Sequence, residues 1–269
     1  MQQMRQLTAY LDGIGLLGPG ISDWPSGALV LAGGSPYVPQ PTVLPAPAAL
    51  PAAERRRTGT IVKLALAVGL EATSRARVDP ATLPSVFCSA GGDGQNCHAI
   101  CEVLASGARQ LSPTRFHNSV HNAPAGYWSI ATGATPPSTA LCAFDASFAA
   151  GLLEALVQVV VERTAVLLIA YDASYPQPLH AKRRIADAFA VALILAPEAR
   201  AASSARLTAA FTDAPTDRIP EPQIEALRSS IPAARCLPLL RRLARREMGR
   251  TVLDYLDSQR LAVEVAACY

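Results

Sequence analysis

Residues 138–171 read STALCAFDASFAAGLLEALVQVVVERTAVLLIAY, and this stretch gives the clearest indication of the fold of the 269-residue chain. Its first seven residues have the character of a strand, and residues 147–162 have the length and the leucine and alanine content of a buried helix. Residues 165–171 form an apolar run that is too short for a helix and suits a strand buried on both faces. Strand, helix and strand at this spacing predict a right-handed crossover, the unit of a parallel α/β sheet.

The flanking segments extend this pattern on both sides. We expect further strands at residues 7–20 (running into a glycine-rich turn), 27–34, 85–90, 188–196, 204–211 and 261–268, and helices at 54–76, 98–107 and 233–248. Six prolines in residues 36–51 exclude a helix or a central strand there, so a surface loop is expected. A turn is expected at 91–96 and a polar loop at 214–222.

The composition narrows the class of protein. Half of the residues are hydrophobic and 17% are charged, which predicts a folded chain. The net charge of +3 is too small for a typical nucleic-acid-binding protein. The most apolar stretch, 149–171, is interrupted by Glu154, Gln158, Glu162 and Arg163, so we expect no membrane span. The N-terminal residues have no secretory-signal pattern, and the six cysteines lie mostly in apolar runs, so a cytoplasmic protein with reduced thiols is expected.

Residues 111–151 read LSPTRFHNSVHNAPAGYWSIATGATPPSTALCAFDASFAAG. This segment resembles the N-terminal half of the β-ketoacyl synthases, in the thiolase superfamily. In that family an Asn-x-x-Ala-Gly segment precedes a glycine, a proline and a strand that ends at the nucleophilic cysteine. The matching residues in this chain are Asn122, Ala125, Gly126, Gly133 and Pro137. With the flanking strands, the resemblance covers most of residues 7–198.

The resemblance implies a fold and a domain organisation. We expect an α/β fold that forms one thiolase-like half, with helices on the faces of a mixed sheet. Residues 1–269 would form a single domain, with a core at 7–212 and a C-terminal helix and strand added over 213–269. In the family the strand that leads to the nucleophile lies at the dimer seam, so residues 138–144 are expected to pair with another chain.

The position of the family's nucleophile falls on Asp145. A ketoacyl synthase needs a thiolate at this strand-to-helix turn, where the helix N-terminus lowers the pKa of the thiol. An aspartate there is a poor acyl acceptor, but it suits the positive end of the helix, so we expect it to act as a helix cap. A chemical role for Asp145 stays open beside this structural one.

The second departure from the family concerns its histidines. In the family two residues, usually histidines of the C-terminal half, activate the carbonyl and malonyl groups. The four histidines of this chain are His98, His117, His121 and His180, so residues 181–269 hold none. Arginine cannot replace them, because it does not give up a proton near neutral pH. The machinery for decarboxylation and condensation is therefore expected to be absent from this chain.

The phrases ASFAAGLLEAL and PLHAKRRIADAFAVALILAP resemble short, single-half ketoacyl-synthase-like proteins of aryl-polyene (xanthomonadin-type) pigment pathways. That resemblance implies a non-catalytic, chain-length-factor-like subunit of polyketide or fatty-acid-type chain elongation. It would pair with a full-length ketoacyl synthase, as a heterodimer or heterotetramer, and meet acyl carrier protein through the complex. It implies no cofactor. Two alternatives stay open: a stand-alone acyltransferase or hydrolase that uses Asp145 or Cys142, and a module that only recruits carrier protein.

Three groups of residues are candidates for the site. The expected pocket or tunnel residues are Phe144, Asp145, Ser147 and Phe148, with Ser147 also a helper of the helix cap. The expected interface residues are Phe116, His117, Asn118, His121, Asn122, Thr139 and Leu141. A basic helical face, either solvated or docking carrier protein, comprises Arg241, Arg242, Arg245, Arg246 and Arg250. Cys97, His98 and Cys101 lack the second pair of ligands that zinc prefers, so no metal is expected.

Overall fold

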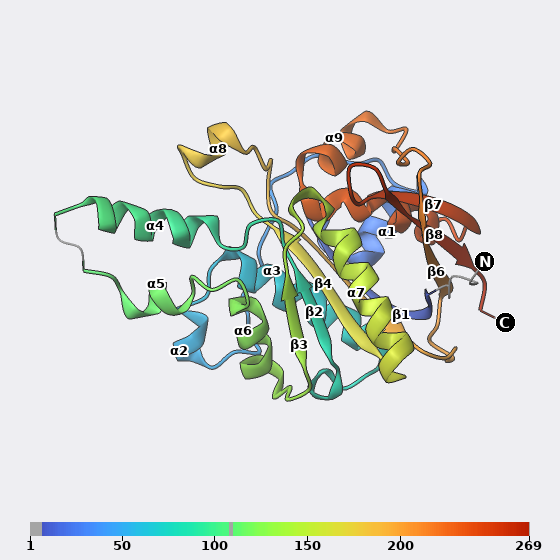
Figure 1. Cartoon of the computed structure of the whole chain (residues 1–269), viewed down its shortest axis with the longest axis horizontal. Coiled ribbons are helices and arrows are strands. Elements are labelled where there is room, and N and C mark those ends of the chain that lie inside the picture. The colour runs from blue at the N-terminus through green and yellow to red at the C-terminus, as the bar shows by residue number, and fades with distance from the viewer. Residues whose placement is uncertain (1–6, 108–109, 269) are drawn as a thin grey trace.

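One eight-stranded mixed sheet organises the protein, whose computed structural model describes residues 7–107 and 110–268 (Figure 1). The strand order is β3-β2-β4-β5-β1-β6-β8-β7. The strands are β1 (Leu7–Leu17), β2 (Ser85–Cys88), β3 (Ser138–Leu141), β4 (Val166–Asp172), β5 (Phe189–Ala196), β6 (Ala205–Thr212), β7 (Gly249–Asp254) and β8 (Arg260–Ala266). β3, β2 and β4 are parallel, and each of the remaining neighbouring pairs is antiparallel.

Helices cover both faces of the sheet. They are α1 (Trp24–Ala32), α2 (Ala52–Arg55), α3 (Thr60–Ala76), α4 (Gly94–Ala105), α5 (Pro113–His117), α6 (Ala123–Thr132), α7 (Ser147–Glu162), α8 (Leu179–Lys182), α9 (Pro222–Ser230) and α10 (Leu237–Ala244), with 3-10 turns η1 (Pro80–Thr82), η2 (Phe144–Ala146) and η3 (Pro232–Cys236). α7 crosses one face, together with η3, α1 and α10, and α3 and α6 pack on the other (Figure 1). The predicted α/β fold with a mixed sheet is confirmed.

The two faces take alternate residues of the central strands, as the strand period of two requires. In β4, Val166 and Leu168 pack among the residues around α7, whereas Leu167 and Ile169 pack among those around α3. All seven residues of β4 are buried, so the continuous apolar run in the sequence corresponds to a strand covered on both sides.

The prediction of a strand at residues 27–34 is wrong. The structure places α1 there, because Asp23 begins a helix: its carboxylate accepts a hydrogen bond from the Ser26 N–H at 2.8 Å, and the Asp23 N–H donates to Ser26 Oγ at 3.3 Å. This reciprocal capping box and Pro25 in the first turn outweigh the apolar run GALVLAGG.

Most other boundaries differ from the predicted ones by a few residues, apart from the C-terminal segment. α3 begins at Thr60 rather than at residue 54, and α4 begins at Gly94 because Asp93 caps it through the Asn96 N–H. The segment 213–269 adds α9, η3, α10, β7 and β8 instead of one helix and one strand. α9 and β7 are therefore additions to the prediction, and the basic helix α10 is eight residues long.

The C-terminal segment shares the hydrophobic core with the rest of the chain. Ile224, Leu237 and Val263 belong to the same buried cluster as Phe148 of α7 and Leu168 of β4. β6, β8 and β7 continue the sheet beyond β1. The segment therefore packs on the α7 face of the sheet and extends the sheet beyond β1.

Candidate functional site

The carboxyl ends of the parallel strands β2, β3 and β4 meet at one edge of the sheet, and the candidate residues follow them. β3 ends at Leu141, and the chain turns through η2 into α7. Phe144 has a φ of 52°, a left-handed conformation that costs a non-glycine residue about 1 kcal/mol or more. Ser147, which is buried, holds this turn: its hydroxyl accepts from the Ala143 N–H at 3.0 Å and donates to the Phe144 carbonyl at 2.7 Å.

Asp145 lies in this turn and is held by two guanidinium groups. Arg183 Nη2 is 2.6 Å from Asp145 Oδ1, and Arg235 Nη2 is 3.0 Å from Oδ2. The expectation that Asp145 caps the helix is wrong, because Ala146 is the N-cap of α7 and no side chain caps it. Arg183 also stacks on the ring of Phe144 at 3.6 Å, so one cation engages both residues of the turn.

The ion pairs continue into the C-terminal segment. Arg235 Nη1 lies 3.2 Å from Asp254 of β7, and Asp254 also accepts from Arg228 of α9 at 2.9 Å. Arg228 makes two further hydrogen bonds to Glu225, and these raise the pKa of Arg228 and lower that of Glu225. A chain of charges therefore joins the turn at Asp145 to α9 and β7.

Little space remains beside Asp145. The cavity that it lines, with Arg183 and Arg235, measures about 60 Å³. Small-molecule pockets usually measure about 300–1,000 Å³. The carboxylate is thus paired with two arginines in a space far smaller than an acyl chain requires.

Asp172, at the end of β4, is a buried acceptor that is not among the residues expected at the site. Its carboxylate accepts hydrogen bonds from Ser89 Oγ at 3.1 Å and from the backbone N–H groups of Ala90 and Ala233 at 2.8 Å. Burial raises the pKa of Asp172 to about 7, against the opposing effect of these donors. It joins the ends of β2 and β4 to η3, and the signal that marks it is a lone acid after the apolar run AVLLIAY.

The two predicted tunnel phenylalanines lie in different surroundings. Phe144 is 59% exposed, whereas Phe148 is 1% exposed and packs in the core on the α7 face. Cys142 is exposed, and its thiol donates to the Ala90 carbonyl at 3.2 Å. The structure therefore brings Phe144, Asp145 and Cys142 to the edge of the sheet and leaves Phe148 in the interior.

β3 is an outer strand of the sheet. The carbonyls of Pro137 and Leu141 accept from the N–H groups of Ser85 and Ser89, so the odd-numbered positions of this segment face β2 and the even-numbered positions face outward. At the opposite outer strand, β7, the outward Val252 is hydrogen-bonded by Asp217 through both its N–H and its carbonyl. Among the described residues, no segment covers β3 in this way.

Of the predicted interface residues, Thr139 and Leu141 belong to β3, and the other five lie within residues 116–122. Phe116 is 68% exposed, and His117 and Asn122 are also exposed. Asn118 is instead buried, because its amide donates to the Arg57 carbonyl and its oxygen accepts from Tyr127. The remaining three are partly buried: His121, Leu141 and Thr139, whose hydroxyl accepts from Gln158 of α7 at 3.2 Å.

α4 and α5 form an arm that projects from this side of the molecule (Figure 1). Of the 12 residues of α4 only Asn96 is buried, and Leu104 is 51% exposed. Helices of this length are marginal alone in water and normally depend on packing. Leu104 near the end of α4, Phe116 of α5, Val120 between α5 and α6, and Ile130 of α6 are all exposed apolar side chains.

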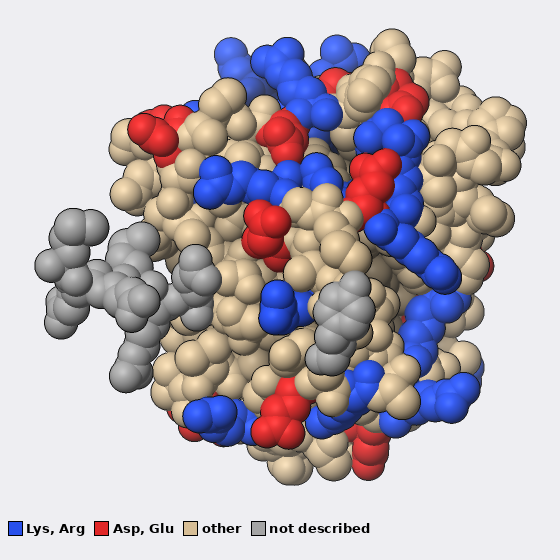
Figure 2. Space-filling view, turned by 90° about the vertical axis from the view of Figure 1, so that its right-hand side faces the viewer, with Lys and Arg blue, Asp and Glu red and all other residues tan. Residues whose placement is uncertain are grey.

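The five arginines predicted to form a basic helical face do not form one free face, because Arg250 lies in strand β7 and Arg245 and Arg246 follow the end of α10 at Ala244. Arg241 pairs with Glu221 at 3.2 Å, Arg242 donates to Thr251 at 2.9 Å, and Arg245 pairs with Glu247 at 3.5 Å. Arg246 lines a separate cavity. On the face that carries the C-terminal strands, acidic side chains lie between the basic ones (Figure 2).

Two general expectations bear on the site. Within residues 7–107 and 110–268, no three His, Cys, Asp or Glu side chains converge as a metal site would need. One helical stretch, Phe144–Glu162, is long and apolar enough to span a membrane, but half of its apolar window is buried against the protein. In this fold it is the core helix that crosses the sheet.

Solved structures share this fold. The ketosynthase (ApeO) in complex with its chain length factor (ApeC) from Xenorhabdus doucetiae matches with a TM-score of 0.73 and 22% identity, over 96% of this chain and 99% of the matched chain. The ishigamide ketosynthase/chain length factor matches with 0.74 and 12%, over 97% and 100%. A β-ketoacyl synthase from Burkholderia phymatum matches with 0.59 and 13%, over 89% and 70%.

Sequence comparison supplies the family. A search of curated proteins finds no match. The family described as "Beta-ketoacyl synthase, N-terminal domain" matches residues 32–250, most of the chain. The chain therefore belongs to the β-ketoacyl synthase N-terminal domain family.

Proposed function

We propose that this chain is a non-catalytic, chain-length-factor-like subunit that pairs with a full-length, cysteine-bearing ketosynthase in polyketide or aryl-polyene chain elongation. The observation that carries the proposal is the turn after β3, where two arginines hold Asp145, the residue that the sequence motif is expected to place at the position of the family's nucleophile. A carboxylate in a 60 Å³ cavity has no room to accept an acyl chain.

The lengths of the matched chains support the same role. This chain spans 99–100% of the matched chains in the two ketosynthase–chain length factor structures, but only 70% of the Burkholderia synthase chain. Residues 181–269 contain no histidine, so in the proposed role the partner synthase supplies the residues for the chemistry. The proposed pair acts in the cytoplasm, as a heterodimer or as a heterotetramer of two such pairs.

The proposed partner surface is the outer edge of β3 with the arm α4–α5 and the exposed side of α6. An uncovered strand edge offers backbone donors and acceptors to a strand of another chain. The contrast with β7, whose edge Asp217 occupies, favours β3 as the edge that pairs. Phe116 and Leu104 add exposed apolar area on the same side, and aromatic side chains are enriched in the buried core of interfaces.

Acyl carrier protein is proposed to meet the assembled pair. Three of the arginines are already bonded within this chain: Arg241, Arg242 and Arg245 contact Glu221, Thr251 and Glu247. Their replacement is therefore expected to lower the stability of the chain more than its affinity for carrier protein. No specific observation favours the stand-alone acyltransferase or hydrolase.

Co-expression with a cysteine-bearing ketosynthase tests the pairing. The complex should co-purify, and its mass by light scattering gives the stoichiometry. Ala140→Pro removes an outward N–H of β3 and leaves the bonds to β2 in place, so it should abolish the complex without unfolding the chain. Ala140→Thr keeps the N–H and serves as the matched control. A complex that forms equally well with Ala140→Pro would contradict pairing through β3.

A further inference from the structure

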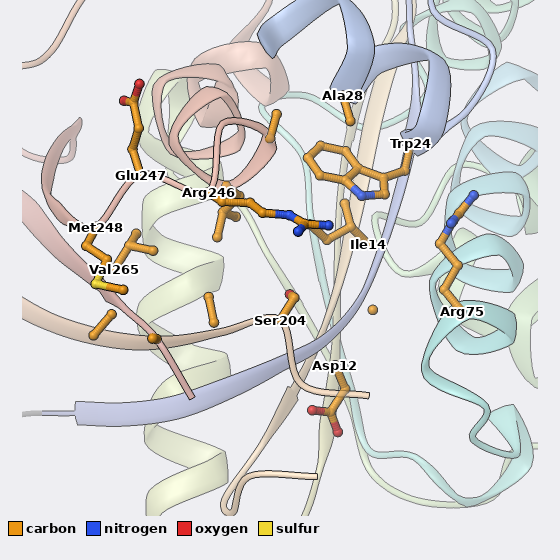
Figure 3. Close-up of a pocket in the computed structure, with 16 residues that line it drawn as sticks. Asp12, Ile14, Trp24, Ala28, Arg75, Ser204, Arg246, Glu247, Met248 and Val265 are labelled. Atoms are coloured by element: carbon orange, nitrogen blue, oxygen red, sulfur yellow. The ribbon is translucent and has the colours of Figure 1, made fainter. Parts of the chain in front are cut away.

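A cavity of about 570 Å³ opens where β6 leaves β1. β6 pairs with β1 only over Leu7–Leu11, whereas β1 continues to Leu17 along β5, with a register shift between Leu11 and Gly13. Beyond Leu11, no strand of the described residues covers the β6 side of β1. α1 and the turn between α10 and β7 wall the resulting space (Figure 3). Its volume lies in the range of about 300–1,000 Å³ that is typical of small-molecule sites.

The walls of this cavity are mainly apolar. Ile14 lies on the β1 side and Trp24 presents its indole ring from α1, with Ala28 beside it (Figure 3). Met248 and Val265 line the opposite side. A flat indole surface among aliphatic side chains suits a flat or short apolar body.

One cationic side chain enters the cavity. The guanidinium of Arg246 extends toward Ile14 and Trp24 (Figure 3). No described acidic group lies within ion-pair distance of it. Arg75 stands at the rim and is already paired with Glu71 at 3.0 Å. The N–H donors of Arg246 are therefore available to form hydrogen bonds with a ligand.

The acidic residues of the lining are turned to other partners. The side chain of Asp12 is fully buried, accepts from Ser203 Oγ at 2.6 Å and lies 3.8 Å from Arg200. Glu247 points away from the cavity and pairs with Arg245 at 3.5 Å (Figure 3). The charge presented to the cavity is thus positive.

We propose that this cavity binds a small organic monocarboxylate with a flat apolar body. The carboxylate takes the bidentate donors of Arg246, which match its geometry, and the apolar body lies on Trp24 and Ile14. A single unpaired guanidinium balances one negative charge, which favours a carboxylate over a phosphate dianion. The cavity lies on the β1–β6 side of the sheet, away from β3, so binding does not depend on the proposed partner or function.

The two tryptophans allow a direct test on the full-length chain. Trp24 lines the cavity, whereas Trp128 is 1% exposed on the opposite face of the sheet. In ¹H–¹⁵N spectra titrated with 2-naphthoate, the indole N–H signal of Trp24 should shift saturably and that of Trp128 should not. The neutral isostere 2-naphthylmethanol should bind at least tenfold more weakly.

Arg246→Gln should weaken 2-naphthoate binding at least tenfold. The other signals in its spectrum should show that the protein remains folded. Arg250→Gln, an exposed arginine of β7 outside the cavity, is the matched control and should bind as the unchanged chain does. The proposal is overturned if Trp24 does not respond, if the neutral alcohol binds as well as the acid, or if Arg246→Gln keeps the affinity.

Discussion

Arg183 Nη2 lies 2.6 Å from Asp145 Oδ1, and this ion pair holds the turn between β3 and α7. Arg235 completes the arrangement from the C-terminal segment at 3.0 Å. The turn is therefore stabilised by charge pairing between parts of the chain that are far apart in sequence. We infer that Asp145 acts as a structural residue of this turn.

Replacing Asp145 by Ala should destabilise the isolated chain modestly. Arg183 and Arg235 would lose their common counter-charge, and because the carboxylate is about one-third exposed, the expected cost is about 1 kcal/mol. Chemical denaturation measures this difference. The stability of Asp145→Asn should fall between those of the unchanged chain and Asp145→Ala, and both variants should still bind the partner synthase. A loss of unfolding free energy of about 4 kcal/mol or more, the size expected for breaking a buried ion pair, would contradict this modest contribution of Asp145 to stability.

The two phenylalanines beside Asp145 should respond in opposite ways. Phe148→Ala removes a fully buried ring and should cost about 3–5 kcal/mol of unfolding free energy. Phe144→Ala removes a ring that is 59% exposed and stacked under Arg183, so stability should change by about 1 kcal/mol or less. In the assembled pair, Phe144→Ala should shift the length of the product. An unchanged product with Phe144→Ala would remove this residue from the chain-length determinants.

The strand-helix-strand unit at 138–171 is predictable because its apolar runs have unambiguous lengths. α7 spans 147–162 as expected, and β4 lies within one residue of the expected run. The helix at residues 27–34 is not predictable in this way, since an apolar run of eight residues fits a strand and a helix equally well. The capping residue Asp23 lies outside that run. Capping residues of this kind determine whether a short apolar segment forms a helix or a strand.

The site is predictable only in part. The position of Asp145 follows from the motif, but its partners do not, because Arg183 and Arg235 are 38 and 90 residues away. Asn118, predicted at the interface, is buried because Arg57 and Tyr127 hold its side chain. Contacts between distant segments leave no local pattern in the sequence.

The stability of the chain should fall as the pH rises through neutrality, partly because of Asp172. Burial raises the pKa of Asp172 to about 7 in the folded chain, from 3.8 for an unperturbed aspartate. Between these two pKa values the folded chain binds the proton of Asp172 more strongly than the unfolded chain does. The contribution of Asp172 to the free energy of unfolding is therefore fully present below about pH 4 and is lost as the pH rises through about 7. From about pH 5 to pH 7 the loss amounts to about 2 kcal/mol.

Urea denaturation of the unchanged chain and of Asp172→Asn at both pH values isolates this contribution. The difference in free energy of unfolding between the two chains should change with pH in the stated direction. Parallel pH profiles for the two chains would show that Asp172 does not titrate in this range.

The arm should matter for pairing and not for folding. Leu104→Glu places a charge on an exposed apolar position of α4, so the melting temperature of the isolated chain should stay within about 2 °C while affinity for the synthase falls at least tenfold. Leu256→Glu is the matched control, since Leu256 is similarly exposed but lies between β7 and β8 at the other end of the sheet. Equal losses of affinity in both variants would argue against the arm as a contact surface.

The proposed role of this chain is to support chemistry that is carried out on another chain. The most direct measurement is intact mass spectrometry of the reconstituted pair after incubation with an acyl-carrier or acyl-CoA donor. We predict one acyl group on the partner synthase and an unchanged mass for this chain. An acyl group on this chain that disappears with Asp145→Ala or Cys142→Ser would contradict the proposed role.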